Sequence, residues 1–252
     1  MTIASGFADQ LIATLLISLR IAPVFAFAPP ITLTKTPAVV RLLLALALGF
    51  WMAVAHADRI GVVTDEALVS VAAGELMFGL STALALQLAF AALLTAGRAL
   101  DIQVGFGLAQ VADPTFRTQM PLVGSLFIYA AGAVFFATDG PADLVAIWSQ
   151  SIEAAPPGSL TGPTSLGGLL GYVKSIFVLA MGLAGAVFLT LFLVDLTIAF
   201  MSRTLPQMNM LVLGFQVKTI ALLATLPFVF AFSGALFLRI VRLAIDAVPE
   251  LL

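Results

Sequence analysis

Six long runs of apolar residues constrain the fold of this 252-residue chain more than any other feature. A helix needs about 20 mostly apolar residues to cross the roughly 30 Å hydrocarbon core of a bilayer, and each run approaches or exceeds that length. The runs are Leu11–Leu33, Val39–Ala55, Ala67–Ala96, Pro121–Ala137, Leu169–Met201 and Leu211–Phe237. The sequence therefore predicts an all-α, polytopic membrane protein with about six hydrophobic helical segments, which form one integral-membrane domain over residues 1–252.

The composition supports a bilayer as the solvent of this chain. Hydrophobic residues make up 62% of the sequence and charged residues 10%, against roughly 25% charged residues in an ordinary soluble domain. Within the runs the apolar residues are continuous and do not alternate with polar ones, which favours helices over an outer-membrane barrel. The net charge of −2 gives no support to nucleic-acid binding, which requires a clustered excess of Lys and Arg.

The first run contains Ala26-Phe27-Ala28, which has the small residues of a signal-peptidase site. However, Asp9 precedes it with no Lys or Arg, Arg20 lies inside the run, and two prolines follow. A signal peptide has a basic start and an uncharged apolar centre, so we expect this segment to remain on the mature protein.

Two of the runs are longer than a simple span requires. Ala67–Ala96 and Leu169–Met201 each have some 30 residues, which at about 1.5 Å per residue reach about 45 Å. Either these helices are tilted and kinked in the bilayer, or the helical bundle extends beyond it. Prolines that could bend the helices occur at Pro23, Pro29, Pro30, Pro37, Pro206 and Pro227.

Two connections between the runs differ in character. Residues 139–168 are rich in Pro, Gly, Ser and Thr, which predicts a flexible extramembrane loop. Residues 97–120 mix charged residues with Gly105, Phe106, Gly107 and Pro114. Irregular backbone near membrane depth is tolerated where it is buried in protein or lines a water-filled space. This segment is therefore either a pore-lining or lumen-filling element or an ordinary structured loop.

Four of the charged residues inside the apolar runs stand out: Arg20, Glu75, Asp195 and Lys218. A charge at mid-membrane costs at least about 2.5–3.5 kcal/mol, so each one needs a partner or a wet surface. One interpretation is a proton or ion relay in a small secondary transporter or ion channel. The other is pairing between helices or between subunits, which the mixture of two bases and two acids favours.

The sequence contains no pattern typical of an enzyme. It has neither the GxxxxGK[ST] pattern of a phosphate-binding loop nor the HExxH pattern of a zinc site. Cysteine is absent and His56 is the single histidine, which leaves little for metal or thiol chemistry. We therefore expect no enzymatic activity and no cofactor, and we interpret His56 as an interfacial side chain.

A series of short motifs, in order along nearly the whole chain, resembles the FliR family of flagellar type III export proteins, which has injectisome T-subunit relatives. The motifs are Arg20-Ile-Ala-Pro23-Val-Phe25, Pro37-Ala-Val-Val-Arg41-Leu, Glu75-Leu-Met-Phe-Gly79, Gly105-Phe106-Gly107-Leu-Ala, Asp113-Pro114, Asp139-Gly140, Asp195, Ser202-Arg203, Pro206-Gln207-Met208-Asn209, Gly214-Phe215 and Lys218. The chain departs from the family pattern at Pro141 and Gln216. The Pro206–Asn209 motif favours the flagellar branch over the injectisome branch.

This resemblance implies a subunit of a hetero-oligomeric export gate in the bacterial inner membrane and flagellar basal body. Its partners would be FliP-like, FliQ-like and FlhB-like subunits, membrane lipid, and unfolded flagellar proteins in transit. It implies a channel plug, for which the candidates are Gly105, Phe106, Gly107, Asp113, Pro114 and Met120. We expect charges that hold helices or subunits together at Arg20, Arg41, Glu75, Asp195, Arg203 and Lys218.

Overall fold

The computed structural model describes residues 2–60, 67–106, 121–159, 166–204 and 209–247. Within these residues every regular element is a helix, which confirms the all-α prediction. In this described part of the chain, five helices are long and apolar enough to cross a membrane, and a bent pair adds a sixth if it forms one span. The prediction of about six hydrophobic helical segments is therefore confirmed.

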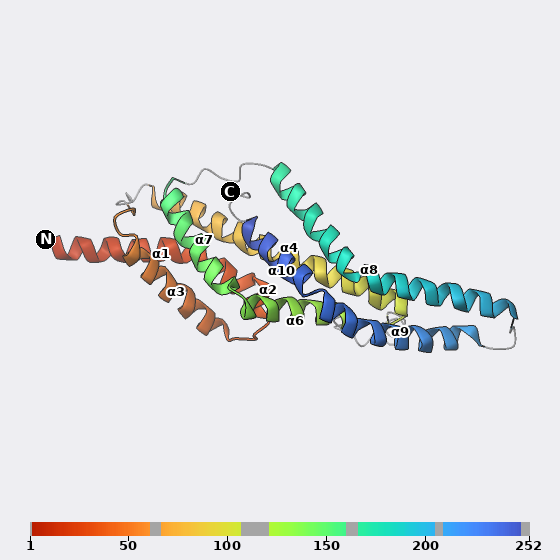
Figure 1. Cartoon of the computed structure of the whole chain (residues 1–252). Helices are drawn as coiled ribbons and strands as arrows, with labels where there is room; N and C mark the ends of the chain where they lie inside the picture. Colours follow the sequence, from red (N-terminus) through yellow and green to blue (C-terminus); the bar gives the residue numbers. More distant parts are fainter. Residues whose placement is uncertain (1, 61–66, 107–120, 160–165, 205–208, 248–252) are drawn as a thin grey trace. The chain divides into compact units, whose positions relative to one another are not determined.

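Figure 1 shows the course of the helices along the chain. They are α1 (Thr2–Phe27), α2 (Pro29–Thr32), α3 (Ala38–Ala55), α4 (Leu68–Val104), α6 (Leu122–Ala137), α7 (Gly140–Ala154), α8 (Leu166–Thr204), α9 (Met210–Phe232) and α10 (Gly234–Asp246). With 37 and 39 residues, α4 and α8 confirm that two segments are overlong. The expected run Leu211–Phe237 is divided, because α9 ends at Phe232 and α10 begins at Gly234.

The prediction of a flexible loop over residues 139–168 is wrong for Gly140–Ala154, because these residues form α7. Pro141 lies in the first turn of this helix, where the missing N–H of proline has no helical partner to lose. Leu144, Trp148 and Ile152 follow at intervals of four residues and are buried. Such spacing places them on one face of a helix. The many Pro, Gly, Ser and Thr residues of the surrounding segment favoured the prediction of a loop instead.

Part of the segment 97–120 is also helical, because its first residues continue α4 to Val104. Gly105 follows with a φ of 101°, a conformation that glycine adopts without steric cost. The N–H groups of Gly105 and Phe106 both donate to the carbonyl of Asp101, at 3.2 and 3.0 Å. This is a common way for a helix to end. Residues 107–120 lie outside the described residues.

The described helices group into two compact units, which we describe separately. Unit 1 comprises Met1–Leu88, Phe135–Val173 and Val241–Leu252, and unit 2 comprises Ala89–Val134 and Lys174–Ile240. The core of unit 1 includes Ile17 and Ile21 of α1 and Trp148 of α7, all at most 1% exposed. In unit 2, Phe127 packs edge-on against Phe230 and Phe237 at centroid distances of 5.9 and 6.1 Å.

A glycine allows α4 to approach α1 closely within unit 1. A Cβ atom at Gly79 would lie 2.6 Å from the carbonyl oxygen of Arg20 and 2.7 Å from that of Leu19. Proline at position 23 of α1 removes the N–H that would otherwise bond to the Leu19 carbonyl four residues earlier. The proline and the glycine that packs against this part of α1 therefore belong to one helix–helix contact.

We predict that Gly79→Ala destabilises the protein by about 1–3 kcal/mol, because an added methyl group must push two backbone carbonyls apart. The matched control is Gly182→Ala in α8, where an added Cβ meets nothing within 4 Å. The control should be neutral or gain up to about 1 kcal/mol from helix propensity. Thermal unfolding of the two purified variants in detergent measures the difference, and equal midpoints would contradict the proposed close approach.

Candidate functional site

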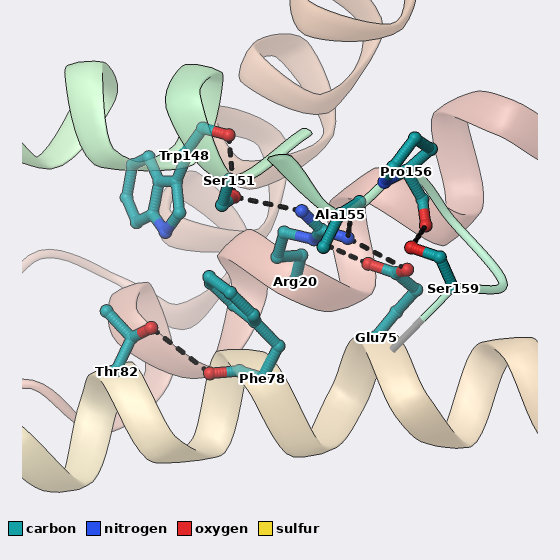
Figure 2. Close-up of polar contacts among 9 residues, drawn as sticks. All are labelled: Arg20, Glu75, Phe78, Thr82, Trp148, Ser151, Ala155, Pro156 and Ser159. Atoms are coloured by element: carbon teal, nitrogen blue, oxygen red, sulfur yellow. Dashed lines mark hydrogen bonds and ion pairs between the residues drawn. The ribbon is translucent and has the colours of Figure 1, made fainter. Parts of the chain in front are cut away.

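Arg20 of α1 and Glu75 of α4 form a fully buried ion pair in unit 1 (Figure 2). The guanidinium Nε donates to Glu75 Oε2 at 2.6 Å, and Nη2 donates to Oε1 at 3.0 Å. Both side chains are 0% exposed. Two parallel N–H···O bonds between planar groups are the strongest form of such a pair, so the positive and negative charges neutralise each other where water is excluded.

The last turns of α7 complete the hydrogen bonding of Arg20. Its Nη1 donates to Ser151 Oγ at 2.9 Å and its Nη2 to the carbonyl of Ala155 at 3.0 Å. The ring of Phe78 lies 4.7 Å from the guanidinium carbon, a distance that favours cation–π attraction. Figure 2 shows these groups surrounding the guanidinium. Arg20 therefore links three helices, α1, α4 and α7.

This arrangement suits a structural role better than a proton relay. A relay needs groups that exchange protons with water or with the next group, whereas both charged side chains are 0% exposed. Within the described residues, the partners of Arg20 other than Glu75 are a hydroxyl and a backbone carbonyl. Neither gains or loses a proton near neutral pH. The geometry thus supports the interpretation of Arg20 and Glu75 as packing charges.

Arg41 of α3 donates hydrogen bonds to backbone carbonyls at the end of α1. Its Nη1 donates to the carbonyls of Phe25 and Ala26, at 3.2 and 2.9 Å. In a continuing helix these carbonyls would accept from the N–H groups of residues 29 and 30, but both residues are proline and lack that donor. The guanidinium of Arg41 replaces these missing N–H donors and so links α3 to the end of α1.

A second ion pair joins α8 to α9 in unit 2. Lys218 Nζ lies 2.6 Å from Asp195 Oδ1 and donates to the carbonyl of Gln103 at 3.3 Å. The two side chains are 20% and 42% exposed, and they lie on the wall of an open cavity of about 600 Å³ that residues of α4, α8 and α9 line. Because this pair is partly exposed, its attraction is weaker than that of the buried pair.

The remaining predicted residues are dispersed. Arg203 is exposed in the last turn of α8 and forms no ion pair with any residue that the structure describes. The side chain of Asn209 accepts from the N–H of Val212 at 3.4 Å and caps α9. Phe106 packs edge-on against Phe215, with a centroid distance of 6.2 Å. The other candidates lie outside the described residues: Gly107, Asp113, Pro114, Met120, Pro206, Gln207 and Met208.

Three polar contacts have no signal in the sequence. Two are the contacts of Arg20 with Ser151 and Ala155, which lie within the predicted loop over residues 139–168. Asp101, although only 5% exposed, accepts from the N–H of Val123 with both carboxylate oxygens at 3.2 Å. A carboxylate at a helix N-terminus satisfies a free N–H and opposes the helix dipole favourably. Twenty-two residues separate Asp101 from Val123, so no local spacing could reveal this cap.

We predict that Glu75→Ala lowers the unfolding free energy by about 3–5 kcal/mol, because it leaves a buried guanidinium without its counter-charge. The double variant Arg20→Met/Glu75→Leu removes both charges and should lose less than Glu75→Ala alone. Thermal unfolding in detergent measures both losses. Asp195→Asn serves as the control at the partly exposed pair and should lose less. A double variant that loses more than Glu75→Ala alone would contradict a buried, mutually neutralising pair.

Comparison with known proteins gives a consistent result along the chain. The family model described as "Bacterial export proteins, family 1" matches residues 11–244. The flagellar biosynthetic protein FliR of Escherichia coli is 27% identical over 241 residues, which cover 92% of this chain and 91% of that protein. The FliR of Bacillus subtilis is 29% identical over 83% of both chains, and the surface presentation of antigens protein SpaR of Salmonella typhimurium is 26% identical over 90% of this chain and 86% of its own. Because the family model covers nearly the whole chain, this membrane protein belongs to the bacterial export proteins, family 1.

Proposed function

We propose that this protein is a subunit of the flagellar type III export channel in the bacterial inner membrane. It forms the export gate with FliP-like and FliQ-like subunits, beside an FlhB-like subunit, and unfolded flagellar proteins pass through that gate. The observation that carries the proposal is the similarity to flagellar FliR proteins over most of the length of both chains. A subunit of the injectisome export apparatus is the second candidate, because SpaR is similar over nearly the same extent.

Two adjoining segments, Phe192–Thr204 of α8 and Leu211–Ala221 of α9, form what we call the α8–α9 hairpin. Its exposed surface supports a role within a larger assembly. Leu191 is the last buried residue of α8, and among Leu211–Ala221 of α9 only Gly214 is buried. Large apolar side chains are nevertheless exposed there: Phe192, Leu193, Leu196, Phe200, Leu211, Val212, Phe215, Val217 and Ile220. This part of the chain has no core of its own and needs apolar cover from outside the chain.

Gentle detergent extraction from cells that express the neighbouring export genes tests this function. We predict recovery of a stable hetero-oligomer several times heavier than the chain's own 26.3 kDa, containing FliP-like and FliQ-like chains, as native mass spectrometry would measure. Replacing one exposed apolar residue of the hairpin, as in Phe200→Asn, should lower the yield of this complex. The control is Val69→Asn in α4, because Val69 is 79% exposed near the start of that helix. Recovery as a monomer or homo-oligomer that transports a small solute would overturn the proposal.

The segment that begins at Gly105 is proposed as a plug of the closed channel, and the packing of Phe106 against Phe215 would hold its first residues in place. Shortening residues 105–107 should increase the passive ion leak through the assembled channel several-fold, because irregular backbone that fills a pore excludes water and ions. Conductance across membranes that contain the purified complex measures this leak. An unchanged leak in a fully assembled complex would contradict the plug.

A further inference from the structure

The two faces of α3 differ sharply in the size of their side chains. The buried residues of this helix are Ala45, Gly49, Met52 and Ala53, three of them small. The exposed face carries large aliphatic and aromatic side chains: Val39, Val40, Leu42, Leu43, Leu44, Phe50, Trp51 and Val54. Only 22% of the span is buried within the chain, so most of its surface needs cover from outside.

The small residues show where α3 packs against protein. A Cβ atom added to Gly49 would clash with Ser18 of α1, so the two helices approach closely there. Helix interfaces inside membranes are enriched in small residues, because dispersion contacts between close backbones drive association. On α3 this signature lies on the inward face. The outward face has no charged residue, Ser, Thr, Asn or Gln between Leu42 and Val54 that could bond to a neighbouring helix.

The length of α3 fits a bilayer. Its 18 residues span about 27 Å, close to the roughly 30 Å of hydrocarbon in a bilayer. Exposed charged residues follow at Asp58 and Arg59, and Lys35 precedes the helix. Trp51 is 57% exposed one turn before the end of the helix, and tryptophan is enriched where lipid headgroups meet hydrocarbon.

We propose that the outward face of α3 contacts phospholipid acyl chains in the assembled complex, so that α3 lies on the outer, lipid-facing surface of the channel. This inference rests on the proposed function for the existence of the complex. It assigns different neighbours to two exposed apolar surfaces. Lipid covers α3, whose length and residue sizes match a bilayer, and partner subunits cover the α8–α9 hairpin.

Tryptophan fluorescence of the intact complex tests the proposal, because the chain has two tryptophans and Trp148 is 1% exposed. The complex is reconstituted in vesicles of phosphatidylcholine with brominated acyl chains, once with the natural sequence and once with Trp51→Phe. The difference between the two spectra is the signal of Trp51. We expect bromine to remove about half of it or more, with bromine near the headgroup quenching more than bromine near the bilayer centre.

A Trp51 signal that bromine at any depth leaves unchanged, in a complex of correct mass, would overturn the proposal and show that a partner subunit covers α3. Failure of the complex to form counts against the proposed function instead, and the native mass of the same sample separates the two cases. A second measurement uses the absence of cysteine from the chain. A spin label at Leu43→Cys should be several times more accessible to oxygen dissolved in lipid than one at Ala45→Cys. Equal, low accessibility at both positions would also overturn the proposal.

Discussion

A charge in an apolar interior must be neutralised and fully hydrogen-bonded, and this requirement governs the arrangement of α1, α4 and α7. Arg20 carries its charge to a position that is 0% exposed, where it is stable only with Glu75 in bidentate contact. The carboxylate accepts from two of its N–H groups, and α7 supplies the further acceptors, Ser151 and Ala155. The pair therefore specifies which three helices meet as well as contributing to their stability.

The same principle of complete hydrogen bonding explains how the chain tolerates its prolines. Pro29 and Pro30 deprive the last carbonyls of α1 of donors, and Arg41 of α3 replaces them. Pro23 removes a donor within α1, and the backbone there meets Gly79 of α4. A freed carbonyl is costly in an apolar environment unless another group approaches it. At Pro23, Pro29 and Pro30, a residue from another helix therefore lies against the freed carbonyls, and these positions connect α1 to α3 and α4.

The apolar surfaces connect this fold to its proposed role. The family match identifies a membrane component of bacterial export, and the exposed apolar side chains show that the chain is not self-contained. The proposed division assigns the bilayer-length helix α3 to lipid and the hairpin of α8 and α9 to partner subunits. Such a division would suit one subunit of a larger channel, with one face outward and another buried between neighbours.

The sequence by itself determined the helical class, the approximate spans and the charges that require partners, because continuous apolar runs and isolated ionisable residues have few physical solutions in a bilayer. It could not determine the pairing of Arg20 with Glu75, which are 55 residues apart, or the cap that Asp101 provides to α6. It also missed α7, whose buried stripe of Leu144, Trp148 and Ile152 lies among residues typical of loops. Tertiary structure decided these features, because a polar contact between distant segments depends on the packing of whole helices and leaves no trace in local spacing.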